Sequence, residues 1–80
     1  MTIAVLGCDA ARAHLSELEG YERMIVIEPS VDELERLLAE LADPRVDYLL
    51  GELPVLPLPD RSVDRVVGPE HPEVARVTAS

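Results

Sequence analysis

The stretch Val46–Val67, VDYLLGELPVLPLPDRSVDRVV, decides the fold of this chain of 80 residues. It predicts a strand over Val46–Leu50, then a loop, then a second strand over Val63–Val67. The loop contains Gly51 and three prolines, which exclude a helix because each proline lacks an N–H and pushes the preceding residue toward extended geometry. Leucine and valine alternate with these prolines, so we expect the loop to pack on an apolar surface, either the chain's own core or something that it binds.

Upstream of this stretch, short apolar runs alternate with helical patterns. Ile3–Leu6 and Met24–Ile27 are continuously apolar, which is typical of strands buried on both faces of a parallel sheet. Between them the spacing predicts a helix over Ala10–Glu19, with Asp9 as its N-cap and Gly20 as its C-cap.

A second helix is predicted after the second apolar run. Ser30 and Glu33 have the spacing of a capping box, in which each side chain serves the other's backbone N–H. An apolar stripe follows, and the helix should stop near Ala42 because Pro44 comes next. Asp32 and Arg36, four residues apart, are expected to pair on its solvent side.

Strand and helix units in this order predict a three-layer α/β sandwich with two long helices and a short, mostly parallel sheet in strand order 3-2-1-4. We expect one domain over residues 1–80, with a core at 1–68 and a tail at 69–80 that forms a short helix or a last edge strand. The fourth strand would then lie at the edge with an unpaired backbone. We therefore expect a homo-oligomer or a partner protein at that edge, or a tail that folds back over it.

The charge and the cysteine content exclude several kinds of function. Sixteen acidic residues against seven basic ones give a formal net charge of −9, which argues against nucleic acid as a primary partner. A single cysteine cannot form an internal disulfide, and no histidine or cysteine cluster predicts a metal site. The first apolar run is too short for a signal peptide or a membrane span, so no membrane association and a cytoplasmic location are expected.

The ligand crevice of an open parallel sheet lies beyond the carboxyl ends of its strands. Three predicted turns meet there, at residues 7–11, 28–30 and 51–59. Glu28 follows Gly7 by 21 residues, and an acidic residue at this place can accept both hydroxyls of a ribose. It can equally be a solvated carboxylate that a helix N-terminus favours. For Cys8, a small buried thiol is a simpler interpretation than a reactive one.

Three motifs of this sequence match the motifs of a known enzyme family. The family's first motif is an apolar strand running into a Gly-Cys-Gly-x-Gly turn, and Val5–Ala11 reads VLGCDAA. Its second is a strand that ends in an acidic residue, often followed by Pro-Ser, and Ile25–Ser30 reads IVIEPS. Its third is a Gly-Asp pair, then Leu-Pro-Phe-Pro-Asp and Ser-Phe-Asp, and Gly51–Asp64 reads GELPVLPLPDRSVD in the same register. With these three motifs the chain resembles the Rossmann-like S-adenosylmethionine-dependent methyltransferases. The resemblance covers residues 3 to about 68, the family's N-terminal half.

This resemblance implies S-adenosylmethionine as a possible cofactor, bound by Gly7, Cys8, Glu28, Glu52 and Leu53. Glycine at position 7 would let the cofactor's amino-acid part approach the backbone, and Glu28 would hold the ribose. Glu52 stands where the family has an aspartate that bonds the adenine amino group, and Leu53 would flank the adenine. No catalytic residue is implied.

Three residues depart from the family's first motif. The acidic residue expected two positions before the first glycine is Val5, which removes one anchor for the cofactor's ammonium group. Asp9 and Ala11 replace the second and third glycines. As an N-cap, Asp9 would occupy amides that a ligand could use, and its position could require backbone angles that only glycine adopts cheaply.

Two functions are therefore predicted. One is a methyltransferase-like domain that is inactive alone and serves as a dimerising or partner-binding module. The other is a domain that binds S-adenosylmethionine or S-adenosylhomocysteine and is completed by a partner chain.

Overall fold

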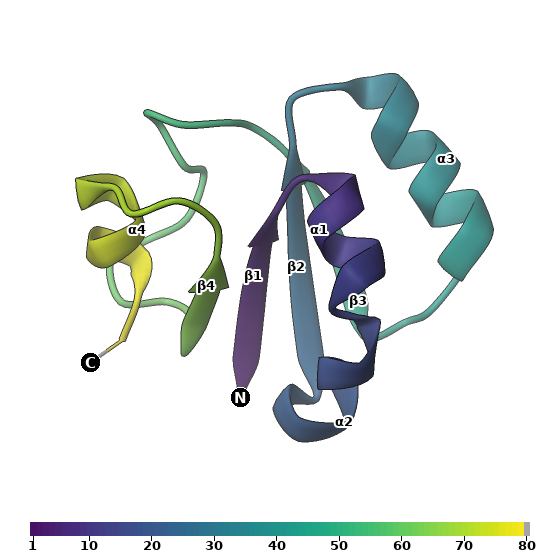
Figure 1. Ribbon diagram of the computed structural model, residues 1–80, viewed down its shortest axis with the longest axis horizontal. Coiled ribbons are helices and arrows are strands. Elements are labelled where there is room, and N and C mark those ends of the chain that lie inside the picture. Colours follow the sequence, from purple (N-terminus) through teal and green to yellow (C-terminus); the bar gives the residue numbers. More distant parts are fainter. Residues whose placement is uncertain (80) are drawn as a thin grey trace.

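A computed structural model describes residues 1–79 and shows a four-stranded parallel sheet in the order β3-β2-β1-β4, as the sequence predicted (Figure 1). The elements in chain order are β1 Thr2–Leu6, α1 Cys8–Ala13, η1 Leu15–Glu17, α2 Leu18–Tyr21, β2 Arg23–Glu28, α3 Val31–Leu41, β3 Val46–Leu50, β4 Arg65–Val67 and α4 Pro72–Val77.

Alternate side chains of the strands enter two separate cores, one on each face of the sheet. Ile3 and Val5 of β1 belong to the cluster under α1 and α3, whereas Ala4 belongs to the cluster on the other face. That second cluster is completed from the proline loop and α4, which cover the opposite side of the sheet (Figure 1). Leu56 and Leu58 of the loop are buried there, so the loop packs on the chain's own core.

The predicted first helix is three short pieces, and both of its predicted caps are wrong. The helix starts at Cys8, two residues early, because Gly7 makes the turn out of β1 and takes the N-cap position without a side-chain hydrogen bond. Asp9 therefore lies inside the first turn. Gly20 lies inside α2, whose C-cap is Glu22.

The start of α3 follows the prediction in one half only. Ser30 is the N-cap, and its hydroxyl accepts a hydrogen bond from the Glu33 N–H at 3.3 Å. The Glu33 side chain does not return to the cap, because the Ser30 N–H donates to Glu28 at 3.1 Å. Glu33 instead pairs with Arg36 at 3.0 Å, in place of the expected pair between Asp32 and Arg36.

The tail folds back on the sheet. β4 begins two residues later than predicted, because Val63 pairs with the tail instead: its N–H donates to the Val77 carbonyl at 3.1 Å, and its carbonyl accepts from the Ala79 N–H at 2.7 Å. The sequence left both a short helix and an edge strand open for the tail, and the helix forms as α4. Val77 of α4 is fully buried in the second cluster. Within residues 1–79, no helix combines the length and the apolar character that crossing a membrane requires.

Candidate functional site

The turns that follow β1, β2 and β3 are joined by backbone hydrogen bonds at the carboxyl edge of the sheet. The Gly7 N–H donates to the Ile27 carbonyl at 2.8 Å, and the Gly51 N–H donates to the Glu28 carbonyl at 3.1 Å. These two bonds fix the spacing of the three turns. The predicted site residues Gly7, Cys8, Glu28 and Glu52 therefore lie in or directly beside neighbouring turns of one edge.

Gly7 has a backbone conformation that other residues reach only with strain. Its φ of 103° and ψ of 147° lie in a region that is essentially restricted to glycine. A Cβ built on Gly7 would have no atom within 4 Å outside its chain neighbours, so the space beside the turn is open. A ligand could approach the backbone at this point.

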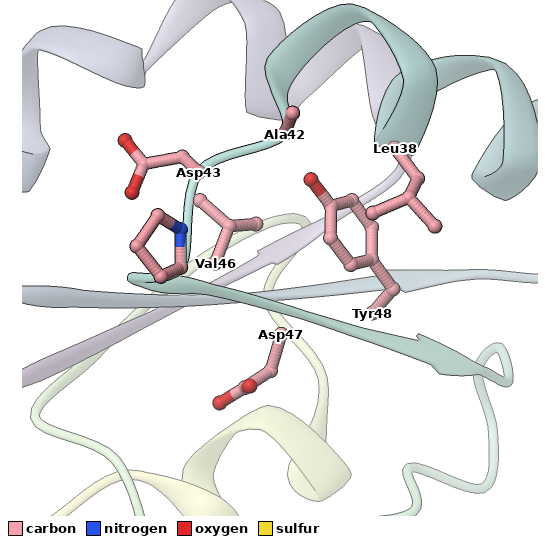
Figure 2. Close-up of a pocket in the computed structure, with 7 residues that line it drawn as sticks. Leu38, Ala42, Asp43, Val46, Asp47 and Tyr48 are labelled. Carbon is pink, nitrogen blue, oxygen red and sulfur yellow. The ribbon is translucent and has the colours of Figure 1, made fainter.

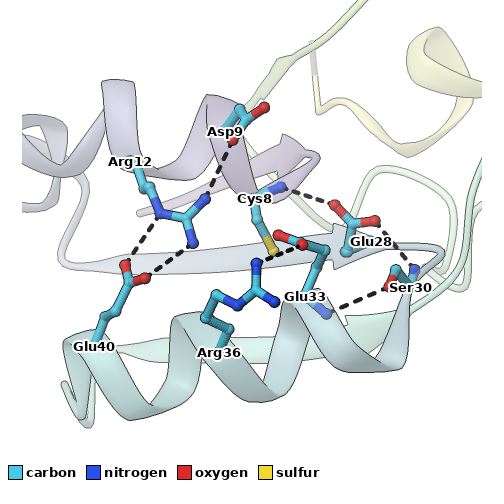
Figure 3. A network of polar contacts seen from close by, with 8 residues as sticks. All are labelled: Cys8, Asp9, Arg12, Glu28, Ser30, Glu33, Arg36 and Glu40. Carbon is cyan, nitrogen blue, oxygen red and sulfur yellow. Dashed lines mark hydrogen bonds and ion pairs between the residues drawn. The ribbon is translucent and has the colours of Figure 1, made fainter.

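The Glu28 carboxylate ties two of the turns together (Figure 3). One oxygen accepts the Cys8 N–H at 3.0 Å, and the other accepts the Ser30 N–H at 3.1 Å. A carboxylate has about four acceptor positions, so Glu28 keeps acceptor capacity for a ligand hydroxyl. Glu28 is half-buried and oriented by two backbone donors, which differs from a freely solvated carboxylate.

Cys8 contributes its backbone and not its thiol. The side chain is 2 % exposed, and burial, followed by the charge of Glu28 and a hydrogen bond to it, raises the pKa of the thiol from its ordinary value of 9.0 to about 11. At neutral pH the thiol is therefore protonated and a poor nucleophile.

Asp9 does not obstruct the site as the sequence suggested. Its fully exposed carboxylate contacts the Arg12 Nη1 at 3.2 Å and accepts no helix N–H (Figure 3). Its backbone is helical and has no positive φ. Arg12 also donates to both carboxylate oxygens of Glu40 at 3.1 and 3.2 Å, which joins α1 to α3. The pKa of the Glu40 carboxyl is lowered mainly by that contact.

The predicted adenine-side residues lie in a tight segment between β3 and the rest of the proline loop. The Val55 N–H donates to the Glu52 carbonyl at 3.0 Å. The Glu52 side chain is exposed, whereas Leu53 packs against the second core cluster. A Cβ at Gly51 would come within 2.8 Å of Pro57, so glycine is needed for the close approach of the loop.

Two residues that hold this loop were missed from the sequence. Glu73 and Arg76 of α4 contact Leu56 and Asp60. The sequence His71-Pro72-Glu73 does indicate a helix start, because proline is favoured at the first helical position. Glu73 and Arg76 are also spaced to pair at i,i+3 on such a helix.

A pocket of about 430 Å³ lies elsewhere, between the end of α3 and the start of β3 (Figure 2). It is lined by Leu38, Ala42, Asp43, Pro44, Val46, Asp47 and Tyr48. The Tyr48 hydroxyl is buried and has no hydrogen-bond partner among residues 1–79. Since β3 runs from Val46 to Leu50, this pocket lies at the opposite end of the strand from the turn that carries Gly51.

The described part of the chain has no cluster of three or more side chains suited to bind a metal ion. The carboxyl edge of the sheet does offer the oriented carboxylate of Glu28 beside the open turn at Gly7. A carboxylate oriented in this way can accept the hydroxyls of a ribose.

Comparison with solved structures identifies methyltransferase folds. A chain from the complex between the Haloferax volcanii Trm112 methyltransferase activator and the putative methyltransferase superposes with a TM-score of 0.80 at 23 % identity, over 96 % of this chain and 40 % of that one. A SAM dependent methyltransferase from Aquifex aeolicus superposes with a TM-score of 0.71 at 22 % identity, over 98 % of this chain and 50 % of that one. Neither family models nor curated proteins give a match.

The fold is therefore that of the Rossmann-like S-adenosylmethionine-dependent methyltransferases, as the sequence motifs predicted. The chain spans only 40 to 50 % of the length of these two neighbours.

Proposed function

We propose that this chain carries the nucleoside-binding half of a methyltransferase site and binds S-adenosylmethionine or S-adenosylhomocysteine. One observation carries the proposal: the Glu28 carboxylate is oriented by the Cys8 and Ser30 amides beside the open turn at Gly7. A carboxylate that is already oriented loses little conformational entropy when it accepts ribose hydroxyls.

The other proposed contacts follow the order of the turns. Gly7 and the Cys8 backbone would border the amino-acid part of the ligand, since a side chain at position 7 would fill that space. Glu52 would accept a hydrogen bond from the adenine amino group, and Leu53 would contact the adenine face. The exposed carboxylate of Glu52 and the half-buried side chain of Leu53 are consistent with these roles.

Val5 limits the affinity that this site can reach. It is fully buried in the core under α1 and α3, so no carboxylate faces the ligand's ammonium group from that position. Asp9, by contrast, leaves the turn free because its side chain points to Arg12. We therefore expect binding through the nucleoside rather than through the amino acid.

Methyl transfer requires that the acceptor and the sulfonium be held in line at close range. We propose that residues outside these 80 hold the methyl acceptor, either in a partner chain or in further sequence. We also propose that none of the 80 residues described by the sequence catalyses the transfer. The two structural neighbours support this proposal, because the matched region is only 40 % of one chain and 50 % of the other.

Calorimetric titration with S-adenosylhomocysteine tests the proposal in the wild type and in Glu28→Gln. The amide keeps the size of the side chain but removes its charge and presents an N–H₂ where two donors already converge. Because a hydrogen bond to a charged group contributes about 1.5–3 kcal/mol, we expect Kd to rise about tenfold or more. Glu35→Gln, an exposed position on α3, is the matched control and should leave Kd unchanged. No heat with wild type at millimolar ligand would overturn the proposal.

A second candidate function is a protein-binding or dimerising module. Both outer strands, β3 and β4, have a strand neighbour on one side only within residues 1–79. The sequence placed the interface at the β4 edge, and this stays a proposal. The methyltransferase complex with an activator among the structural neighbours supports binding to a partner. Sedimentation equilibrium tests the homodimer, because a mass of one chain up to high concentration would exclude it.

A further inference from the structure

Side chains of α4 take both backbone polar groups of Leu56 in the proline loop. The Leu56 N–H donates to the Glu73 Oε1 at 3.1 Å, and the Leu56 carbonyl accepts from the Arg76 Nη2 at 3.2 Å. Nη2 also donates to the same Glu73 oxygen at 2.7 Å, and Nη1 contacts Asp60 at 2.6 Å. One glutamate and one arginine therefore connect two points of the loop to α4.

α4 is itself firmly attached to the domain. Val77 is fully buried in the second core cluster, beside Leu56 and Leu58. Its first turn is capped by the His71 Nδ1, which accepts the Glu73 N–H at 3.0 Å. The Arg61 N–H donates to the Arg76 carbonyl at 2.9 Å. The groups that hold Leu56 thus belong to a fixed element.

Glu73 and Arg76 both stay charged over the neutral pH range. The pKa of Glu73 is lowered, mainly by the hydrogen bond from Arg76 and then by the Leu56 amide. The pKa of Arg76 is raised by Glu73 and then by Asp60. Side-chain exposures of 19 % for Glu73 and 34 % for Arg76 place the pair at the boundary of the core, where such bonds are screened less than at the surface.

The segment between Gly51 and Leu56 is short and held at each end. At its start, the Gly51 N–H is bonded to β2. At its end, Leu56 is held by α4. The segment contains Glu52 and Leu53, the two residues assigned to the adenine. Their positions depend on where Leu56 is held, because only a few rotatable residues intervene.

We infer that α4 is a clamp for segment 52–55, with Glu73 and Arg76 as positioning residues for Glu52 and Leu53. The effect on ligand affinity rests on the proposed function, whereas the effect on the loop does not. Removing the clamp frees the loop and lowers the fraction of molecules in which Glu52 and Leu53 are ready to bind, which raises the apparent Kd.

The test uses the full chain with Glu73→Ala, Arg76→Lys and the control Glu70→Ala, which removes an exposed carboxylate just before α4. Amide hydrogen exchange at Leu56 is compared with exchange in β2, and the same proteins are titrated with S-adenosylhomocysteine. In Glu73→Ala we expect protection at Leu56 to fall about tenfold or more with β2 unchanged, and Kd to rise severalfold. Arg76→Lys should give an intermediate loss, because an ammonium group lacks the planar fork that reaches three acceptors.

Three results would overturn the inference. Unchanged protection at Leu56 would show that the clamp does not hold the loop. An equal fall at Leu56 and in β2 would show that Glu73 only stabilises the whole domain. A mobile Leu56 with an unchanged Kd would show that the clamp does not position the binding residues. If the wild type fails to bind, the proposed function fails, and the exchange comparison still decides whether the clamp exists.

Discussion

Val77→Ala tests whether the last turn of the chain belongs to the core. Val77 is fully buried and lies in the second cluster with Ala4, Ile27 and Val63. The substitution removes two buried carbon atoms, which costs about 1.6 kcal/mol at about 0.8 kcal/mol each. The cavity left behind adds to this cost because the surrounding strands relax only partly, so we expect a total of about 2–3 kcal/mol.

Urea unfolding followed by circular dichroism measures this loss of free energy of unfolding. For a domain of this size it corresponds to a fall in Tm of roughly 8–24 °C. Val55→Ala is the matched control, because the same two carbons are removed from a side chain that is 71 % exposed. Equal effects of the two substitutions, or a loss below about 0.5 kcal/mol for Val77→Ala, would refute the assignment of the tail to the core.

Two further predictions concern the turn after β1. Gly7→Ala should lower the free energy of unfolding by about 1–3 kcal/mol through backbone strain, although the added Cβ has room. Gly20→Ala, inside α2 and equally open, is the control and should be neutral or stabilising. Equal Tm values for the two variants would contradict this prediction. With its pKa raised from 9.0 to about 11, the Cys8 thiol keeps its proton longer in the folded chain than in the unfolded one, so the free energy of unfolding should fall more steeply between those pH values in wild type than in Cys8→Ala. Parallel pH curves for the two proteins would show that Cys8 is not buried as described.

The strands were predictable because their apolar runs have a cause that is local in the sequence. A strand covered on both faces must be apolar at every position, and Ile3–Leu6 and Met24–Ile27 meet that condition. The Pro residues around Leu56 likewise excluded a helix whatever the rest of the chain does. The expected strand order 3-2-1-4 went with the resemblance to the methyltransferase fold, since crossover handedness decides only which face of the sheet each connection covers.

The first helix shows where local signals were insufficient. Asp9 has good N-cap chemistry and Gly20 good C-cap chemistry. The helix nevertheless starts at Cys8, since the backbone of Gly7 has already turned out of β1 and Glu28 takes the Cys8 N–H. A residue 20 positions away in the sequence thus satisfies an amide at the start of this helix.

The sequence by itself determined the apolar strands, the parallel order, the helix after Ser30 and the three turns at the carboxyl edge, because each depends on the periodicity or backbone restrictions of a few adjacent residues. Only the tertiary structure decided how the Glu28 carboxylate is oriented, that Asp9 leaves the turn free, and that Glu73 and Arg76 hold the loop at Leu56. These contacts join residues far apart in the chain, and their partners are chosen by distance and by unsatisfied backbone groups after folding.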